Sequence, residues 1–195
     1  ELGRLAEGET VLVHSAAGGL GLAAIAVARQ RGARVIATAG SEEKRQYLRE
    51  LGVEHVFDSR RLDWARQVLQ ATGGRGVDVV LNLLTGAALE LGLSVLAEDG
   101  RMVEVGKKDI YADRTIALSA FRKGISLVAV DLAGLMERRP ARFERAFDAV
   151  WQLVRSGQLA PLPVRRYPFA SAAEALRDMS GGRHIGKLVL VDPST

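Results

Sequence analysis

Short apolar runs alternate with segments of helical spacing along the first 160 residues, and this alternation limits the fold more than any other feature. Short runs that are apolar almost throughout are typical of strands buried on both faces, as in a parallel sheet. We predict six such strands, at residues 10–14, 34–38, 54–58, 77–82, 101–105 and 125–130. Helices are expected between them, at residues 20–31, 41–51, 63–71 and 87–96. The pattern predicts an α/β fold, a doubly wound parallel sheet of six strands with helices on both faces.

The last part of the chain departs from this alternation. Pro161 and Pro163 interrupt the regular elements, because proline lacks the backbone donor that helices and ladders need. Further elements are expected at 142–156, an amphipathic helix, at 171–179, a short helix, and at 186–191, a strand. We therefore divide the chain into a Rossmann domain at residues 1–160 and a C-terminal segment at residues 161–195. The final strand either extends the sheet or returns to a domain outside this chain.

The composition excludes several classes of protein. The chain has 195 residues, enough for one full domain, with 48% apolar and 26% charged residues, a globular balance. It has no Cys, which excludes a disulfide scaffold, a thiolate zinc site and a cysteine nucleophile. The histidines, His14, His55 and His184, are too far apart in sequence to suggest a metal site, and His14 is expected in the core. We expect no metal.

Charge and hydropathy limit the kinds of partner and the environment that we expect for this chain. The net charge is +4, but the basic residues are spread along the chain, so no nucleic-acid partner is expected. The longest uncharged run, at residues 11–28, contains three glycines in a turn and does not resemble a membrane span. We expect a cytoplasmic protein without a secretory leader. Because the first residue is Glu1 and not Met, we also expect a fragment of a longer chain.

The turn at residues 16–21, A-A-G-G-L-G, is the strongest local motif. It follows a predicted strand and opens a predicted helix, which is the context that a G-x-G-x-x-G dinucleotide-binding turn requires. Gly18 allows the backbone to approach a pyrophosphate, and Gly21 allows the helix to pack on the strand. The free amides at the helix N-terminus would then meet the phosphates. The alternative is a small-residue turn that only joins a strand to a helix.

The end of the second strand indicates which dinucleotide is bound. An NAD site needs an acidic residue there to bond the ribose 2′-hydroxyl, and this chain has Gly40 and Ser41 instead. Lys44 and Arg45 follow one helical turn later, and Arg60 follows the third strand. Cations and a hydroxyl suit the 2′-phosphate of NADPH, although two glutamates in the same helix count against it. The alternative is a solvated helix face.

Strand ends also carry the residues that could act chemically. Lys107 follows the fifth strand and Asp131 follows the sixth, and their side chains could pair so that the ammonium donates a proton. The alternatives are a surface lysine and an aspartate that caps the next helix. The tyrosines lack a lysine four residues later, so the short-chain dehydrogenases are excluded. The match of residues 181–187 to a phosphate loop is rejected, because Leu188 replaces the magnesium-binding Ser or Thr.

Longer stretches resemble one family, in the family's order and over nearly the whole chain. They are V-L-V-H-S-A-A-G-G-L-G from Val11, G-S-E-E-K-R from Gly40, F-D-S-R from Phe57, G-V-D-V-V-L-N from Gly76, G-R-M-V-E-V-G-K from Gly100 and H-I-G-K from His184. The chain resembles the cofactor-binding part of the medium-chain dehydrogenase/reductase superfamily. More narrowly, it is similar to the enoyl reductase domains of modular type I polyketide synthases and animal fatty acid synthase.

The resemblance implies roles for individual residues. Those around the NADPH pyrophosphate would be Gly18, Gly19, Leu20 and Gly21. Those around the 2′-phosphate would be Ser41, Lys44 and Arg60, and those lining the nicotinamide Thr85, Val105 and Gly106. Lys107 and Asp131 would form the proton-donor pair.

The resemblance also implies a reaction and partners. The reaction is NADPH-dependent reduction of a trans-2-enoyl thioester carried on an acyl carrier protein, within a multidomain synthase in polyketide or fatty acid synthesis. Family members have a GroES-like substrate domain, to which part of residues 161–195 would belong, so this chain alone is expected to bind cofactor without turnover. Two alternatives are a quinone oxidoreductase-like NADPH reductase and a non-catalytic NADPH-binding module that pairs chains as a homodimer through a sheet edge.

Overall fold

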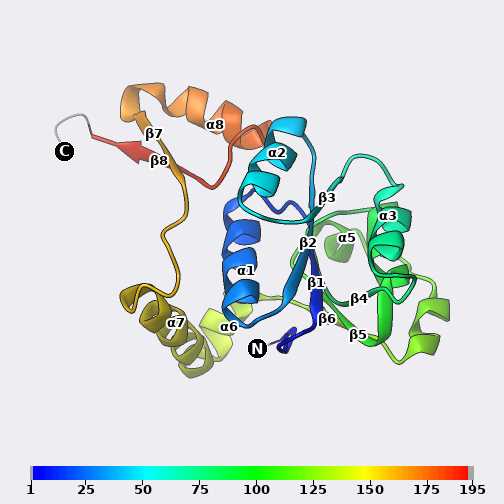
Figure 1. The fold of residues 1–195 in the computed structure, drawn as a ribbon. Coiled ribbons are helices and arrows are strands. Elements are labelled where there is room, and N and C mark those ends of the chain that lie inside the picture. Colours follow the sequence, from blue (N-terminus) through cyan, green and yellow to red (C-terminus); the bar gives the residue numbers. More distant parts are fainter. Residues whose placement is uncertain (1, 193–195) are drawn as a thin grey trace.

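Six parallel strands form the central sheet of the protein (Figure 1). The computed structural model describes residues 2–192. The strands lie in the order β3-β2-β1-β4-β5-β6, and each neighbouring pair is parallel. Their bounds are β1 Thr10–Val13, β2 Arg34–Ala39, β3 His55–Asp58, β4 Val77–Asn82, β5 Leu96–Glu104 and β6 Ser126–Ala129. The predicted doubly wound sheet is confirmed, and its strand order reverses between β1 and β4, where such folds bind ligands.

Helices cover both faces of this sheet, as predicted. The first four are α1 Gly19–Gln30, α2 Glu42–Glu50, α3 Trp64–Ala71 and α4 Ala87–Ser94. Residues of α1 and α2 form one core with one face of the sheet, and residues of α3 and α4 form a second core with the other. Successive side chains of β1 alternate between the two cores: Val11 and Val13 belong to the first and Leu12 to the second. A strand buried on both faces is therefore apolar throughout.

The structure differs from the predicted boundaries around β5. Helix α4 ends at Ser94 and β5 already begins at Leu96, so the helix predicted at 87–96 is too long and the strand predicted at 101–105 too short. An irregularity in the pairing with β4 interrupts the regular part of β5. Asp99 has a φ of 56° there. In a sequence, an Asp-Gly pair is typical of a helix end. Here Asp99 and Gly100 belong instead to the irregular part of a strand.

Several short helical segments lie outside the predicted elements. They are α5 Lys108–Tyr111, η1 Leu118–Lys123, α6 Leu132–Arg138 and η2 Phe169–Ser171. The predicted amphipathic helix is present as α7, Pro140–Arg155. Its apolar face is left uncovered by the described residues, with Phe147 56% and Trp151 45% exposed. Within residues 2–192, no helix has the length and apolar character needed to cross a bilayer.

The C-terminal segment forms a small unit beside the main sheet (Figure 1). It contains β7 Val164–Pro168, α8 Ala172–Ser180 and β8 Lys187–Val191. The final strand does not extend the six-stranded sheet, because β8 pairs in parallel with β7, a strand that the sequence analysis does not predict. This unit contacts the main domain through the backbone of Gly186, whose amide donates to the carbonyl oxygen of Ala17 at 2.9 Å and which forms a bridge with Gly18. The C-terminal segment thus meets the glycine-rich turn.

Candidate functional site

The glycine-rich turn joins β1 to α1 at the point where the strand order reverses. It folds tightly, since the Ala16 amide donates to the Thr38 carbonyl of β2 at 3.0 Å. A Cβ atom at Gly21 would lie 2.5 Å from the Ala16 Cα and 2.6 Å from its carbonyl oxygen. Both are backbone atoms, so only glycine allows α1 to approach the turn this closely.

No side-chain hydrogen bond from residues 2–192 caps the N-terminus of α1. Gly18 is the N-cap residue. The first turn of the helix contains no acidic residue, and Leu20 is 44% exposed. Uncapped amides and the positive end of the helix dipole together favour a bound phosphate. The amides of Gly19 and Leu20 therefore suit the pyrophosphate of a dinucleotide, whereas the Gly18 amide already donates to the Ser15 carbonyl at 3.0 Å.

Lys187 is a second feature of this turn, and the residue-by-residue sequence reasoning does not select it. The side chain of Lys187 crosses the start of α1: a Cβ atom at Gly19 would lie 2.8 Å from its Cδ and 2.9 Å from its Nζ. This brings a cation to the helix N-terminus from a position far along the chain. The H-I-G-K stretch contains Lys187, but nothing local in the sequence indicates that β8 returns to the turn.

Ser41 and Lys44 lie together at the start of α2, at the carboxyl end of β2. The Ser41 hydroxyl caps the helix by accepting from the Lys44 amide at 3.4 Å. The Lys44 Nζ donates to the carbonyl oxygen of Gly182 in the C-terminal segment at 2.6 Å. Burial lowers the pKa of the Lys44 amino group; the nearby Glu43 raises it, and the positive charge of Arg60 lowers it further. Lys44 thus lies within electrostatic range of a second cation.

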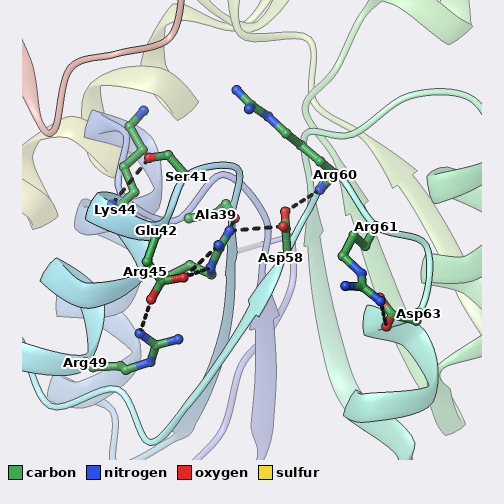
Figure 2. A network of polar contacts seen from close by, with 10 residues as sticks. All are labelled: Ala39, Ser41, Glu42, Lys44, Arg45, Arg49, Asp58, Arg60, Arg61 and Asp63. Carbon is green, nitrogen blue, oxygen red and sulfur yellow. Dashed lines mark hydrogen bonds and ion pairs between the residues drawn. The ribbon is translucent and has the colours of Figure 1, made fainter.

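Arg60 approaches the same place from the other side. Its Nε would lie 3.1 Å from a Cβ atom at Gly40, so its guanidinium lies against the residue that precedes Ser41. The Arg60 amide donates to Asp58, but its guanidinium makes no ion pair with any side chain in residues 2–192. In Figure 2, Lys44 and Arg60 both extend toward the top of the view, from α2 and from the segment after β3. An anion could compensate their mutual repulsion.

Arg45, the other cation expected near this place, has a structural role (Figure 2). Its guanidinium donates to Glu42 at 2.7 Å and to the Ala39 carbonyl at 3.1 Å, and it lies 3.3 Å from the Asp58 carboxylate. The Arg45 side chain is only 14% exposed. Glu42 is therefore neutralised by Arg45 and Arg49, so the objection that the glutamates of α2 repel a phosphate applies only to Glu43, which lies near Lys44.

The carboxyl ends of β4 and β5 carry the residues predicted to line a nicotinamide. Thr85 is exposed in the loop after β4, and Val105 and Gly106 are half-buried in the loop after β5. The Val105 amide donates to the Asn82 carbonyl at 3.0 Å, which keeps the two strand ends adjacent. The structure places these residues at one edge of the sheet, as the sequence predicts.

Lys107 and Asp131 are close together, and Asp131 has a nearer partner. The Lys107 Nζ lies 3.4 Å from the Asp131 carboxylate, whereas Arg138 of α6 donates to the same carboxylate at 2.7 Å. Asp131 also caps α6 by accepting from the Gly134 amide at 3.3 Å. Arg138 first, then the Gly134 amide and Lys107, lower the pKa of Asp131. The capping and pairing interpretations thus both describe Asp131, and Lys107 stays partly exposed at 36%.

A family model described as zinc-binding dehydrogenase matches residues 51–190. The chain belongs to the medium-chain dehydrogenase/reductase superfamily. The donor set nevertheless does not fit zinc: there is no Cys, and the described residues contain no group of three potential ligands. We therefore assign no role to a metal.

Curated relatives agree with the expected resemblance. A Mycolicibacterium smegmatis protein named mycocerosic acid synthase-like polyketide synthase is 50% identical over 196 residues, covering 100% of this chain and 9% of the relative. The phthioceranic/hydroxyphthioceranic acid synthase of Mycobacterium tuberculosis is 48% identical over 195 residues, again covering 100% of this chain and 9% of the relative. The chain thus spans about a tenth of the length of the curated relatives it matches.

Solved structures place the chain more narrowly. The nucleotide-binding subdomain of the enoylreductase domain of PpsC from Mycobacterium tuberculosis is 48% identical with a TM-score of 0.77, and 82% of this chain matches 89% of that one. The CurF ER cyclopropanase from the curacin A biosynthetic pathway is 33% identical with a TM-score of 0.89, and 98% of this chain matches 57% of that one. The predicted similarity to polyketide synthase enoyl reductases is confirmed.

Proposed function

We propose that this chain is the NADPH-binding part of an enoyl reductase that reduces a trans-2-enoyl thioester on an acyl carrier protein. Family membership supports a nicotinamide cofactor, and the anion site built from Ser41, Lys44 and Arg60 supports NADPH in particular. That site is the observation that carries the choice, because the end of β2 brings cations where an NAD site needs a carboxylate. Lys187 joins Gly18, Gly19, Leu20 and Gly21 as a pyrophosphate residue.

Replacing Lys44 or Arg60 by Ala tests the cofactor assignment. Each substitution removes one charge-assisted contact to the 2′-phosphate, so the affinity for NADPH should fall about tenfold. The affinity for NADH should stay the same within about twofold, because NADH has no phosphate there. Both Kd values are measured by fluorescence titration of the 195-residue chain.

A matched control is Arg66→Ala, which removes an exposed cation of α3 and should leave both affinities unchanged. Native protein that binds NADPH and NADH equally well would contradict the phosphate site. A Lys44→Ala variant with weakened binding of both dinucleotides would instead indicate a general loss of structure, because Lys44 also donates to the Gly182 carbonyl, and the Arg60→Ala variant then decides.

The proposed reaction gives a role to each of the strand-end residues. NADPH would supply a hydride to the β-carbon of the enoyl thioester. Thr85, Val105 and Gly106 would line the nicotinamide subsite at the ends of β4 and β5. The enolate formed by hydride addition needs a proton at its α-carbon, and the Lys107 ammonium would donate it. Asp131, held by Arg138 and the α6 N-terminus, would orient Lys107 through their 3.4 Å contact.

Replacing Lys107 by Ala should lower kcat for a crotonyl thioester about tenfold in the full-length protein. The loss is limited because a side chain that is 36% exposed can be replaced in part by water as the proton source. The Kd for NADPH should not change, since Lys107 does not contact the adenosine or pyrophosphate subsites. Steady-state kinetics and fluorescence titration measure the two quantities.

Lys123→Ala serves as the control, because Lys123 donates to the backbone carbonyls of Ser94 and Leu96, at the end of β5 away from Lys107. Unchanged turnover of Lys107→Ala would remove Lys107 as the proton donor. Loss of turnover together with retained cofactor binding would exclude a purely structural or binding module.

The substrate and the carrier protein require surfaces beyond this chain. The similar CurF structure is longer, and 57% of it is matched here. The uncovered apolar face of α7 and the C-terminal unit with β7 and β8 would contact a substrate domain and other domains of a synthase. We therefore propose residues 1–160 as the cofactor domain and residues 161–195 as a connecting segment. The chain alone is expected to bind NADPH without turnover.

A further inference from the structure

Two polar side chains are buried next to each other at the carboxyl ends of β4 and β5. Asn82 is 0% exposed and Glu104 is 4% exposed. They are register partners in the parallel sheet, and the Asn82 Nδ2 donates to the Glu104 Oε2 at 2.5 Å. We call them the Asn82–Glu104 pair. Neither is assigned a role in the site described above, although both lie at the sheet edge where the nicotinamide subsite is proposed.

Each member of the pair also binds the backbone of the loop that follows its own strand. The Glu104 Oε1 accepts from the Gly106 amide at 2.6 Å. The Asn82 side chain donates to the Leu84 carbonyl at 2.8 Å and accepts from the Leu84 amide at 3.2 Å. Thr85 follows Leu84 and Lys107 follows Gly106. The pair therefore connects the two loops that carry the proposed nicotinamide and proton-donor residues.

We propose that Asn82 and Glu104 are positioning residues that hold these two loops at a fixed separation, so that Lys107 and the nicotinamide subsite are aligned. This inference rests on the proposed function. The hydrogen bonds run without interruption from the Leu84 backbone through both side chains to the Gly106 backbone. A change in either side chain would release one loop from the other.

The hydrogen-bond pattern requires a carboxylate at position 104. Both partners of Glu104 are donors, so both carboxylate oxygens must accept. Asn82 cannot turn its amide over, because the Leu84 amide and carbonyl fix its oxygen and nitrogen. A glutamine at this position has one acceptor and one donor end. Whichever way it points, a donor then faces either the Asn82 amide or the Gly106 amide.

Burying a carboxylate costs free energy, because the charged group loses its hydration. Burial raises the pKa of Glu104, whereas the bonds from Asn82 and Gly106 lower it. An apolar pair of similar size would avoid this desolvation, and such replacements are often neutral or stabilising in proteins. An apolar pair could not bind the loop backbones, however. The cost of burying Glu104 is therefore consistent with a need to place the loops.

The test is Glu104→Gln in the full-length protein, assayed with a crotonyl thioester. We expect kcat to fall about tenfold or more, while the Kd for NADPH stays within about threefold, because neither side chain of the pair bonds a residue of the adenosine or pyrophosphate subsite. The kinetic isotope effect with NADPH deuterated at the transferred position should rise, since misalignment slows hydride transfer. A merely structural defect would lower the amount of active enzyme and leave this isotope effect unchanged.

Controls separate the possible failures. Glu98→Gln removes an exposed carboxylate from the same strand and should leave all three quantities unchanged. Unchanged kcat in Glu104→Gln, with Lys107→Ala impaired, would overturn the positioning role alone. Unchanged kcat in both variants would instead contradict the proposed function. If Glu104→Gln does not fold, Glu104→Asp is measured by the same criteria, because it keeps both acceptors but is too short to reach both partners.

Discussion

Replacing Gly21 by Ala should lower the free energy of unfolding by about 3 kcal/mol, because the added methyl group has no space. Its Cβ would lie 2.5 to 2.7 Å from three backbone atoms of Ala16, none of which can move without the turn. Relief requires α1 to shift away from β1, and the first amides of α1 would then lose their alignment. We therefore expect NADPH binding to weaken as well. Urea unfolding and fluorescence titration measure the two effects.

Gly18→Ala is the informative comparison. Gly18 has a φ of −77°, which any residue can adopt, and an added Cβ would lie 3.3 Å from the Ser15 carbonyl oxygen. Its stability should change by less than about 1 kcal/mol, while the new methyl group beside the N-terminus of α1 should still weaken NADPH binding. Equal destabilisation by both substitutions would show that the packing role of Gly21 is not special. Native-like stability of Gly21→Ala would contradict the close-approach argument outright.

The sequence predicts the central sheet well, because its strands are buried on both faces and carry their signal locally. In β1, Val11 and Val13 pack against one helix layer and Leu12 against the other, so the run is apolar throughout. The boundaries fail where backbone geometry decides. Around Asp99 and Gly100 the sequence resembles a helix end, and only the pairing with β4 makes it part of β5.

Contacts between distant segments are the part of the site that local patterns do not contain. Lys187 reaches Gly19 because β8 returns to the glycine-rich turn through the Gly186–Ala17 bond. Strand β7, Val164–Pro168, contains Arg165 and Arg166 and ends in proline, so it lacks the continuous apolar run by which the other strands are recognised. Its partner strand begins about twenty residues later, and only the fold brings the two together.

The electrostatic roles of residues are likewise predicted in part by the sequence and are visible in part only in the folded structure. Ser41, Lys44 and Arg60 are found from their place after strand ends, a position that topology fixes. Whether a cation is available, however, depends on its neighbours. Arg45 already forms ion pairs with Glu42 and Asp58, whereas the guanidinium of Arg60 has no carboxylate partner in the described part of the chain. Likewise, nothing in the sequence distinguishes Glu104 from any other residue at the end of a strand. Only the folded structure shows the two donors that bind its carboxylate.

His14 is buried at the end of β1, directly before the glycine-rich turn, and it predicts sensitivity to acid. It is 0% exposed, as expected for a core residue. Its Nδ1 lies 2.8 Å from the Thr38 hydroxyl oxygen, and its ring packs edge-on against Trp64 at 4.7 Å between centroids. No carboxylate faces it in the described structure, so nothing compensates a positive charge. Burial lowers the pKa of His14 from 6.5 to about 3.

A lowered histidine pKa makes the native state less stable in acid. Below pH 6.5 the unfolded chain binds a proton at His14 that the folded protein does not bind until the pH approaches 3. The free energy of unfolding therefore decreases as the pH is lowered from 6.5 toward 3. The His14 contribution should lower the free energy of unfolding by about 2 kcal/mol between pH 8 and pH 5. Urea unfolding at a series of pH values measures this dependence of stability on pH, and His14→Asn should remove it even if that variant is less stable overall.

The control is His55→Asn, at a partly exposed side chain, which should keep the pH dependence. An unchanged pH dependence in His14→Asn would assign the acid sensitivity to other groups, and it would contradict the neutral, desolvated state of His14.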